Sequence, residues 1–179
     1  MIFFLGDTHF NHEAIIRHAG RRYASVAEMN ASLMTTWNSV VTSERDEVWH
    51  LGDFGFHAQG AEDLAAIWWR LRGRKSLVVG NHDVKNPQVL RLPWERVETL
   101  FELKTDGRRV VLCHYPLESW PGMHYGALHL HGHCHGTLAH QIPHRFDVGV
   151  DVVGAPVSLD AIFERAAGQQ FVPQDHHGA

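Results

Sequence analysis

No stretch of the sequence is as long and apolar as the roughly 20 residues that a transmembrane helix needs, so no membrane span is expected. Only two of the 179 residues are cysteine, which excludes a disulfide-rich scaffold and favours a reducing compartment. The first residues also lack the basic segment and the long apolar core of a secretory signal peptide. We therefore predict a cytoplasmic protein with free thiols.

Basic residues are not in excess, since 16 Lys and Arg stand against 20 Asp and Glu and give a net charge of −4. Proteins that bind nucleic acid usually present a basic face, so nucleic acid is a possible partner but not the favoured one. The length suits a single hydrophobic core. We predict one domain over residues 1–168 and a loose polar tail over residues 169–179, and the sequence leaves the oligomeric state open.

Histidine is abundant instead, with 16 residues, and several of them stand beside Asp or Asn. Five short segments share this character: GDTH (6–9), LGDF (51–54), GNHD (80–83), CHYP (113–116) and HGHCH (131–135). Most of these segments follow apolar stretches, and loops at strand ends commonly carry functional sites. Carboxylate, imidazole and amide oxygen together suit a borderline divalent ion. The pattern therefore indicates a metal centre.

Short apolar stretches alternate with helical patterns along the first half of the chain. There the sequence predicts strands at 2–5, 47–51 and 76–79, and helices at 12–19, 26–41 and 64–71. Ser25 and Glu28 have the spacing of a capping box at the start of the longest helix. Further on, it predicts strands at 97–104, 109–113, 127–131 and 145–149, a hairpin turn at Asp106-Gly107, and a last helix at 158–165. This order favours layers of helix and sheet with mixed strand pairing.

The five segments, in this order, resemble the motifs of the calcineurin-like metallophosphoesterase family, which read D-x-H, G-D, G-N-H-D/E, H and G-H-x-H. They cover residues 6–136, and the segment DTHFNH is similar to small bacterial and phage members. The resemblance implies a four-layer α/β/β/α sandwich of two mixed β-sheets. It also implies two divalent metal ions, for which Mn²⁺ is favoured and Fe, Zn, Ni or Co are alternatives.

Carried over position by position, the resemblance implies Asp7, His9 and His135 as ligands of one ion, Asn81, His114 and His133 as ligands of the other, and Asp53 as the bridge. His82 resembles the catalytic histidine of the family, which contacts the phosphate and either protonates the leaving oxygen or stabilises charge in the transition state. Asp83 would orient His82. The expected reaction is attack on phosphorus by a hydroxide that bridges the two ions.

Residues near these motifs are further candidates for substrate contact. His12 stands three positions after His9, so it is expected either to touch substrate or only to begin a helix. Arg17, Arg21 and Arg22 follow, and one of them is expected to contact a phosphate while the other two form a solvated basic face. Arg22 is the candidate for the contact. His57 and His124 either line the pocket or are surface residues.

The expected function is hydrolysis of phosphate esters, with a small phosphate ester as substrate and with phosphodiesters or nucleotides favoured over phosphoproteins. Two alternatives remain open. One is a metal-dependent nuclease, which needs a local basic stripe. The other is a non-catalytic binding module on the same fold, which is disfavoured because all seven ligand positions and His82 are retained.

Overall fold

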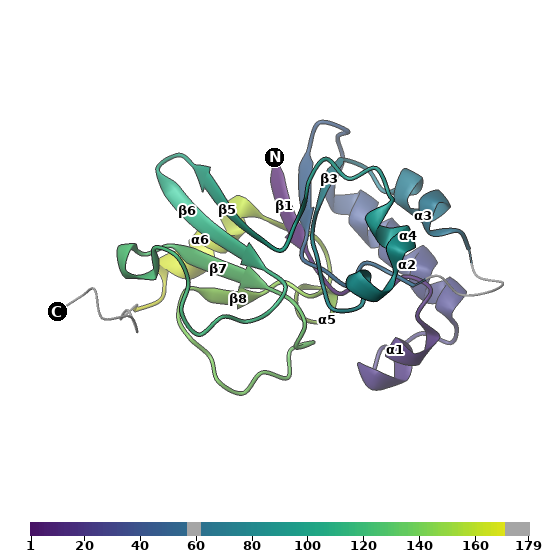
Figure 1. Ribbon diagram of the computed structural model, residues 1–179. Coiled ribbons are helices and arrows are strands. Elements are labelled where there is room, and N and C mark those ends of the chain that lie inside the picture. The colour runs from purple at the N-terminus through teal and green to yellow at the C-terminus, as the bar shows by residue number, and fades with distance from the viewer. Residues whose placement is uncertain (57–61, 171–179) are drawn as a thin grey trace.

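The computed structural model of the chain describes residues 1–56 and 62–170 (Figure 1). Within this part the strands form two sheets, one with the order β4-β3-β2-β1-β9 and one with the order β5-β6-β7-β8. The strands are β1 Ile2–Leu5, β2 Glu47–His50, β3 Arg74–Val78, β4 Val97–Glu98, β5 Leu100–Thr105, β6 Arg108–Cys113, β7 Leu128–His131, β8 Arg145–Asp147 and β9 Val157–Ser158.

Both sheets are mixed. In the first sheet β1, β2, β3 and β4 are parallel, and β9 pairs antiparallel with β1. In the second sheet β5 and β6 form an antiparallel hairpin across the predicted turn at Asp106-Gly107, while β6, β7 and β8 are parallel. The carboxyl ends of the parallel strands therefore lie at one edge of each sheet, and in α/β sheets this is the edge where ligands bind.

The helices follow the sequence pattern where they are long. They are α1 Glu13–His18, α2 Val26–Val40, α3 Leu64–Arg70, α4 Pro87–Leu90, α5 Val150–Val153 and α6 Leu159–Ala167, with short 3₁₀ turns η1 Asp83–Lys85 and η2 Met123–Tyr125. The predicted cap of α2 is present, because Ser25 Oγ accepts a hydrogen bond from the Glu28 backbone N–H at 3.2 Å. None of the helices in the described part of the chain is long and apolar enough to cross a membrane.

Alternating side chains divide the first sheet into two apolar faces. Phe3, Val48 and Leu77 pack with Trp37 of α2 and Ile67 of α3. Side chains at neighbouring positions, among them Phe4 and Trp49, point to the other face and pack against Val110 and Leu112 of the second sheet. Helices thus cover one face of the first sheet, and the second sheet lies against the other (Figure 1).

The outer face of the second sheet is closed by a loop. Trp120, Met123 of η2 and Ile142 pack there against Val111. Helix α6 instead places Ile162 among the side chains between the two sheets, next to β1 and β9. The predicted α/β sandwich of two mixed sheets is confirmed, with a loop and a 3₁₀ turn as the layer outside the second sheet.

The predicted strand at 97–104 proved to be two strands in different sheets. β4 continues the parallel order of the first sheet, and after Thr99 the chain enters β5 at the edge of the second sheet. A chain that passes from one sheet to another in extended conformation needs no turn residue, so the sequence carries no break at this point. The elements α4, α5 and β9 were not predicted, because four residues or fewer do not establish a period.

Candidate metal centre

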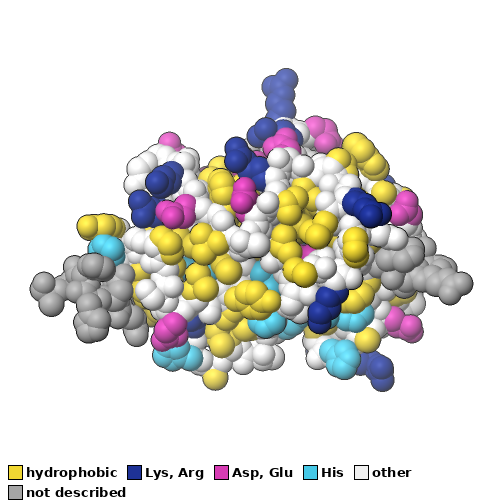
Figure 2. Space-filling view, in the orientation of Figure 1, with side chains coloured by type: hydrophobic (Ala, Val, Ile, Leu, Met, Phe, Trp, Pro, Cys, Tyr) yellow, Lys and Arg dark blue, Asp and Glu magenta, His cyan; other side chains and the backbone are white. Residues whose placement is uncertain are grey.

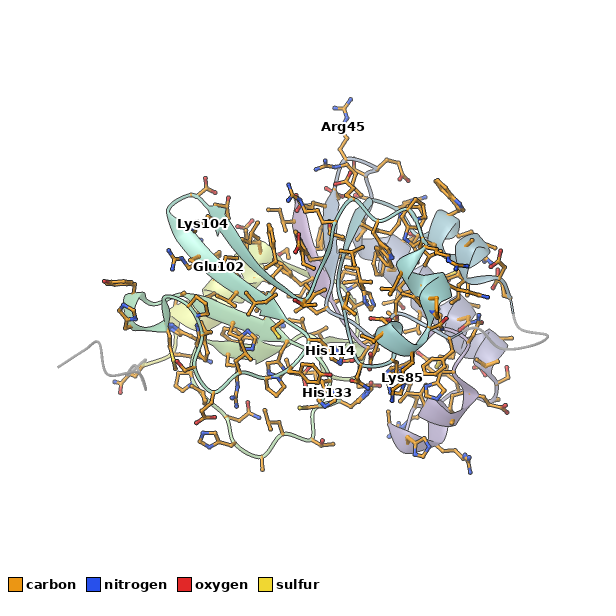
Figure 3. The ribbon with its side chains drawn as sticks, viewed as in Figure 1. Arg45, Lys85, Glu102, Lys104, His114 and His133 are labelled. Carbon is orange, nitrogen blue, oxygen red and sulfur yellow. The ribbon has the colours of Figure 1, made fainter. Side chains whose placement is uncertain are left out.

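Each metal-ligand candidate lies at or just beyond the end of a strand. Asp7 and His9 follow β1, Asp53 follows β2, Asn81 follows β3, His114 follows β6, and His133 and His135 follow β7. The carboxyl ends of these five strands lie on the same side of the two packed sheets, so the side chains that follow them converge there. Figure 3 shows His114 and His133 at this junction, and Figure 2 shows histidines gathered along the same margin of the molecule.

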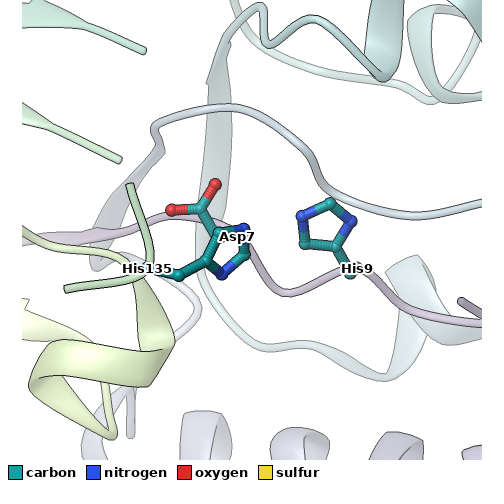
Figure 4. A group of neighbouring side chains, drawn as sticks. All are labelled: Asp7, His9 and His135. Atoms are coloured by element: carbon teal, nitrogen blue, oxygen red, sulfur yellow. The ribbon is translucent and has the colours of Figure 1, made fainter. Parts of the chain in front are cut away.

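Asp7, His9 and His135 form the first ligand group (Figure 4), with one ligand atom of each lying within 4.8 Å of the others. Asp7 Oδ1 and His9 Nε2 are both buried, and neither has a hydrogen-bond partner in the structure. Buried polar atoms without a partner are uncommon and costly. A divalent cation bound between these atoms would satisfy both, so the residues present fit a metal ion.

Asn81, His114 and His133 form the second group. Asn81 Oδ1 lies 3.1 Å from His114 Nε2 and 3.0 Å from His133 Nδ1. Ligand atoms held about 2.1 Å from one ion at angles near 90–110° are roughly 3.0–3.4 Å apart. Both distances fall in this range, so the three residues fit a single ion.

Asp53 lies between the two groups. Its Oδ2 is 3.6 Å from His9 Nε2 and 3.5 Å from His114 Nε2. Its Oδ1 accepts a hydrogen bond from the His82 backbone N–H at 2.9 Å, which fixes the plane of the carboxylate. One oxygen thus faces a ligand of each group, as a bridging carboxylate requires.

The ring nitrogens of the histidines are oriented by their outer partners. His114 Nδ1 donates to the backbone carbonyl of Leu51 at 2.8 Å, and His135 Nδ1 donates to the carboxylate of Asp151 at 2.6 Å. With the proton on Nδ1 in the neutral rings, Nε2 carries the lone pair. In both histidines this lone pair is available to a metal ion.

Several ligand candidates have a strained backbone. Five of them have positive φ: Asp7 56°, His9 51°, Asp53 57°, His133 72° and His135 47°. Residues other than glycine adopt this region rarely, at a cost of about 1–3 kcal/mol each, and such residues cluster at functional sites. The loops are therefore shaped for the convergence of these side chains.

Electrostatics favours a cation at the same place. Burial raises the pKa of Asp7 well above its usual range, and the carboxylate of Asp53 raises it further. Burial also lowers the pKa of His9, and the charged groups His135 and Arg21 add to this. Burial lowers the pKa of His114 as well. The hydrogen bond with Asp151 raises the pKa of His135. A site that keeps His9 and His114 neutral and penalises an unpaired carboxylate suits metal coordination.

A cleft of about 690 Å³ opens beside the ligand groups and is lined by His12, His82, His133 and His135, among others. The His82 side chain is 35% exposed, and its Nε2 lies 3.9 Å from Asp53 Oδ2. The ring of His12 stacks on Phe56 with centroids 4.0 Å apart, and its Nδ1 lies 3.3 Å from His9 Nδ1. The structure thus brings His82 and His12 to the cleft, beside the ligands.

Asp83 does not lie where the sequence analysis placed it. Its side chain is fully buried and accepts backbone hydrogen bonds from Asp53 at 2.7 Å, Phe54 at 2.9 Å and Gly80 at 2.8 Å. These bonds tie the loop after β2 to the loop after β3. The expected role in orienting the His82 ring is therefore replaced by a role in holding the backbone of Asp53.

Three other candidates lie away from the cleft or outside the described residues. Arg22 is exposed and lines a separate depression with Tyr23 and Thr36. His124 lies in η2 on the outer loop, with its ring 3.9 Å from that of Tyr125. His57 falls outside the described residues, as do positions 171–179 of the predicted tail.

Sequence analysis did not identify Asp151, and it considered Arg21 only as one of three arginines that could contact a phosphate. Both residues lie close to the first ligand group. Asp151 binds His135, and Arg21 binds Asp151 as well as the backbone carbonyls of Asp7 and Thr8. Asp151 stands in no motif. Arg21 was one of three neighbouring arginines that only the fold distinguishes.

Two facing mixed sheets with candidate ligands at the ends of their strands are the arrangement that the resemblance of the motifs to calcineurin-like metallophosphoesterases implies. No family model matches the sequence. The chain belongs to the same family as the uncharacterised protein MJ1445 of Methanocaldococcus jannaschii, to which it is 31% identical over 168 residues, covering 90% of this chain and 88% of that protein.

Two further similarities span nearly the whole chain. The gene 66 protein of Mycobacterium phage L5 is 29% identical over 195 residues, covering 90% of this chain and 91% of the phage protein. The crystal structure of AQ665 from Aquifex aeolicus, a protein of unknown function, is 26% identical with a TM-score of 0.75, covering 92% of this chain and 98% of that one.

Proposed function

We propose that the protein hydrolyses phosphate esters with two divalent metal ions, and that phosphodiesters or nucleotides are preferred to phosphomonoesters. The observation that carries this proposal is the position of Asp53 Oδ2, 3.6 Å from His9 Nε2 and 3.5 Å from His114 Nε2. A carboxylate between two ligand groups is the arrangement that a two-metal hydrolase needs. When bound, the two ions supply Lewis acidity and lower the pKa of water towards about 7.

The residues of the chain take distinct parts in this reaction. Asp7, His9 and His135 would hold one ion, Asn81, His114 and His133 the other, and Asp53 both. His82 lines the cleft, and its ring would give a proton to the leaving oxygen. His12, whose ring centroid lies 5.8 Å from that of His82, would contact the phosphate beside it.

The charge of the cleft favours diesters. Among the described residues that line it, none is lysine or arginine, while histidines and apolar side chains such as Ile15 dominate. A phosphomonoester carries close to two negative charges at neutral pH, whereas a diester carries one. Beyond the ions, the cleft therefore offers little to neutralise the second charge. The favoured ion is Mn²⁺, with Fe, Zn, Ni or Co as alternatives, because oxygen and imidazole ligands together suit a borderline divalent ion.

The proposal is tested with metal-stripped protein reloaded with Mn²⁺ and assayed on a chromogenic phosphodiester and the matching phosphomonoester. We expect faster diester cleavage, and its loss in Asp53→Asn. The control is Asp160→Asn, at a carboxylate in the first turn of α6, on a different element from the ligands. Full activity in Asp53→Asn, or no hydrolysis of either ester by protein that holds two ions, would contradict the proposal.

A further inference from the structure

The guanidinium of Arg21 is buried, with only 4% of its side chain exposed, and it joins segments from both ends of the chain. Its Nε and Nη2 donate to the two oxygens of Asp151, each at 2.8 Å. Nη2 also donates to the Asp7 carbonyl at 2.6 Å, and Nη1 donates to the Thr8 carbonyl at 2.8 Å and to Met29 Sδ at 3.4 Å. Arginine has five N–H donors, so every one of them is used.

Asp151 continues this connection to the metal ligands. Its Oδ2, which accepts from Arg21, also accepts from His135 Nδ1 at 2.6 Å. Asp151 lies in α5, and the preceding residue, Val150, donates its backbone N–H to the Gly6 carbonyl at 2.9 Å. Two ligands of the first group, Asp7 and His135, are therefore held through one buried ion pair.

The second ligand group has a different support. His114 Nδ1 donates to the backbone carbonyl of Leu51, and the rings of His114 and His133 contact Asn81. The backbone N–H of His133 donates to Asp7 Oδ2 at 2.9 Å, which is a contact between the two groups. No described contact links Arg21 or Asp151 to this group. The two groups thus differ in the outer partners that orient their histidine rings, a backbone carbonyl for His114 and Asp151 for His135.

We propose that Arg21 and Asp151 are positioning residues that set the affinity of the ion held by Asp7, His9 and His135, and leave the affinity of the second ion unchanged. This inference rests on the metal ligands of the proposed function. Asp151 fixes the tautomer of His135 and makes its Nε2 a stronger donor, while Arg21 holds the loop of Asp7 in its strained conformation. Loss of such a partner weakens metal binding about 10–100-fold.

Mn²⁺ titration of the metal-stripped full chain, followed by calorimetry, separates the two ions. Arg21→Lys keeps the charge but cannot span both oxygens of Asp151, and Asp151→Asn replaces one acceptor by a donor. In both variants we expect one ion to bind as in the wild type and the other to bind 10–100-fold more weakly. Arg22→Lys, at the exposed neighbouring arginine, should behave as the wild type.

The outcomes distinguish failure of the positioning role of Arg21 and Asp151 from failure of the proposed function. The positioning role would be overturned by unchanged affinity for both ions, because the pair would then be dispensable. It would also be overturned by equal weakening of both ions, or by failure of both variants to fold in urea titrations, because the pair would then be generally structural. Wild-type protein that binds two ions but cleaves no phosphate ester would overturn the proposed function and would not affect the positioning role of Arg21 and Asp151. Wild-type protein that binds no ion would overturn both.

Discussion

Asp83 holds the backbone of Asp53 from another loop: its Oδ2 accepts the Asp53 N–H at 2.7 Å across 30 positions of sequence. The same carboxylate binds the N–H groups of Phe54 and Gly80. The proposed bridging carboxylate therefore depends on a side chain that belongs to neither ligand group.

Asp83→Asn should destabilise the protein. An amide has one acceptor oxygen, so one or two of the three backbone N–H groups would lose their partner, at about 1–3 kcal/mol each. We expect the free energy of unfolding, measured by urea titration in EDTA, to fall by about 2–4 kcal/mol. Asp106→Asn, in the exposed hairpin turn, should cost little, and equal stability of the two variants would contradict the prediction.

Gly80→Ala should disturb the bridging carboxylate. A Cβ built on Gly80 would lie 2.2 Å from Asp53 Oδ1 and 2.6 Å from the Asp53 backbone nitrogen, so the loop after β2 must shift. We expect metal content after dialysis to drop from two ions towards one or none. Gly168→Ala is the matched control, because its nearest neighbouring atom is 3.9 Å away. Two tightly bound ions in Gly80→Ala would show that the site tolerates the shift.

His82→Gln should lower turnover about 10²–10⁴-fold and leave metal binding intact, because His82 lines the cleft and is the proposed proton donor. The loss should be large for an alkyl leaving group and small for p-nitrophenolate, which needs no proton. His140→Gln, at an exposed histidine paired with Glu118, serves as the control. A loss that is the same for both leaving groups would contradict the role as proton donor.

Removal of metal should destabilise the fold. Without a cation, Asp7 is a buried carboxylate whose pKa is raised by burial, so folding must accommodate an unfavourable charge. Ions that bind only the native state add RT ln(1 + [L]/Kd), which is about 2.7 kcal/mol per site at 100 times Kd. Thermal unfolding with Mn²⁺ against EDTA measures the difference. Identical unfolding temperatures would mean that the ions bind weakly or not at all.

His129 should make stability depend on pH below neutrality. Burial lowers its pKa from 6.5 to about 4, and its Nε2 accepts a hydrogen bond from the Leu117 N–H. Because the folded pKa is depressed, this stabilisation is complete above pH 6.5 and is lost as the pH falls towards 4. The amount is about 3 kcal/mol, at 1.36 kcal/mol per pKa unit. His129→Gln should flatten the dependence of unfolding free energy on pH in this window, and an unchanged slope would contradict the assignment.

The strands that carry the ligands could be predicted because each is an apolar segment that ends in a turn residue. Ile2–Leu5 and Glu47–His50 lie within a residue of the predicted bounds, and Asp7 and Asp53 follow them. The packing of two sheets with the ligands at the ends of their strands was predicted from the order of the motifs. No local pattern in the sequence predicts it.

Contacts over long distances could not be predicted. Arg21 and Asp151 are 130 positions apart, and nothing in the residues around either identifies its partner. The role of Asp83 was misjudged for a related reason. Its neighbour His82 is adjacent in sequence, but the 3₁₀ turn η1 directs the carboxylate towards the loop after β2.

The pairing of β1 with β9 has a consequence for synthesis. Phe3 and Phe4 lie opposite Ser158 and Val157, so the strand that leads into Asp7 and His9 gains its second neighbour only when the last strand has emerged from the ribosome. Asp7 and His9, the first candidate ligands to be synthesised, are thus among the last to be enclosed. We expect the nascent chain to expose these two side chains to solvent until residues 157–158 have emerged.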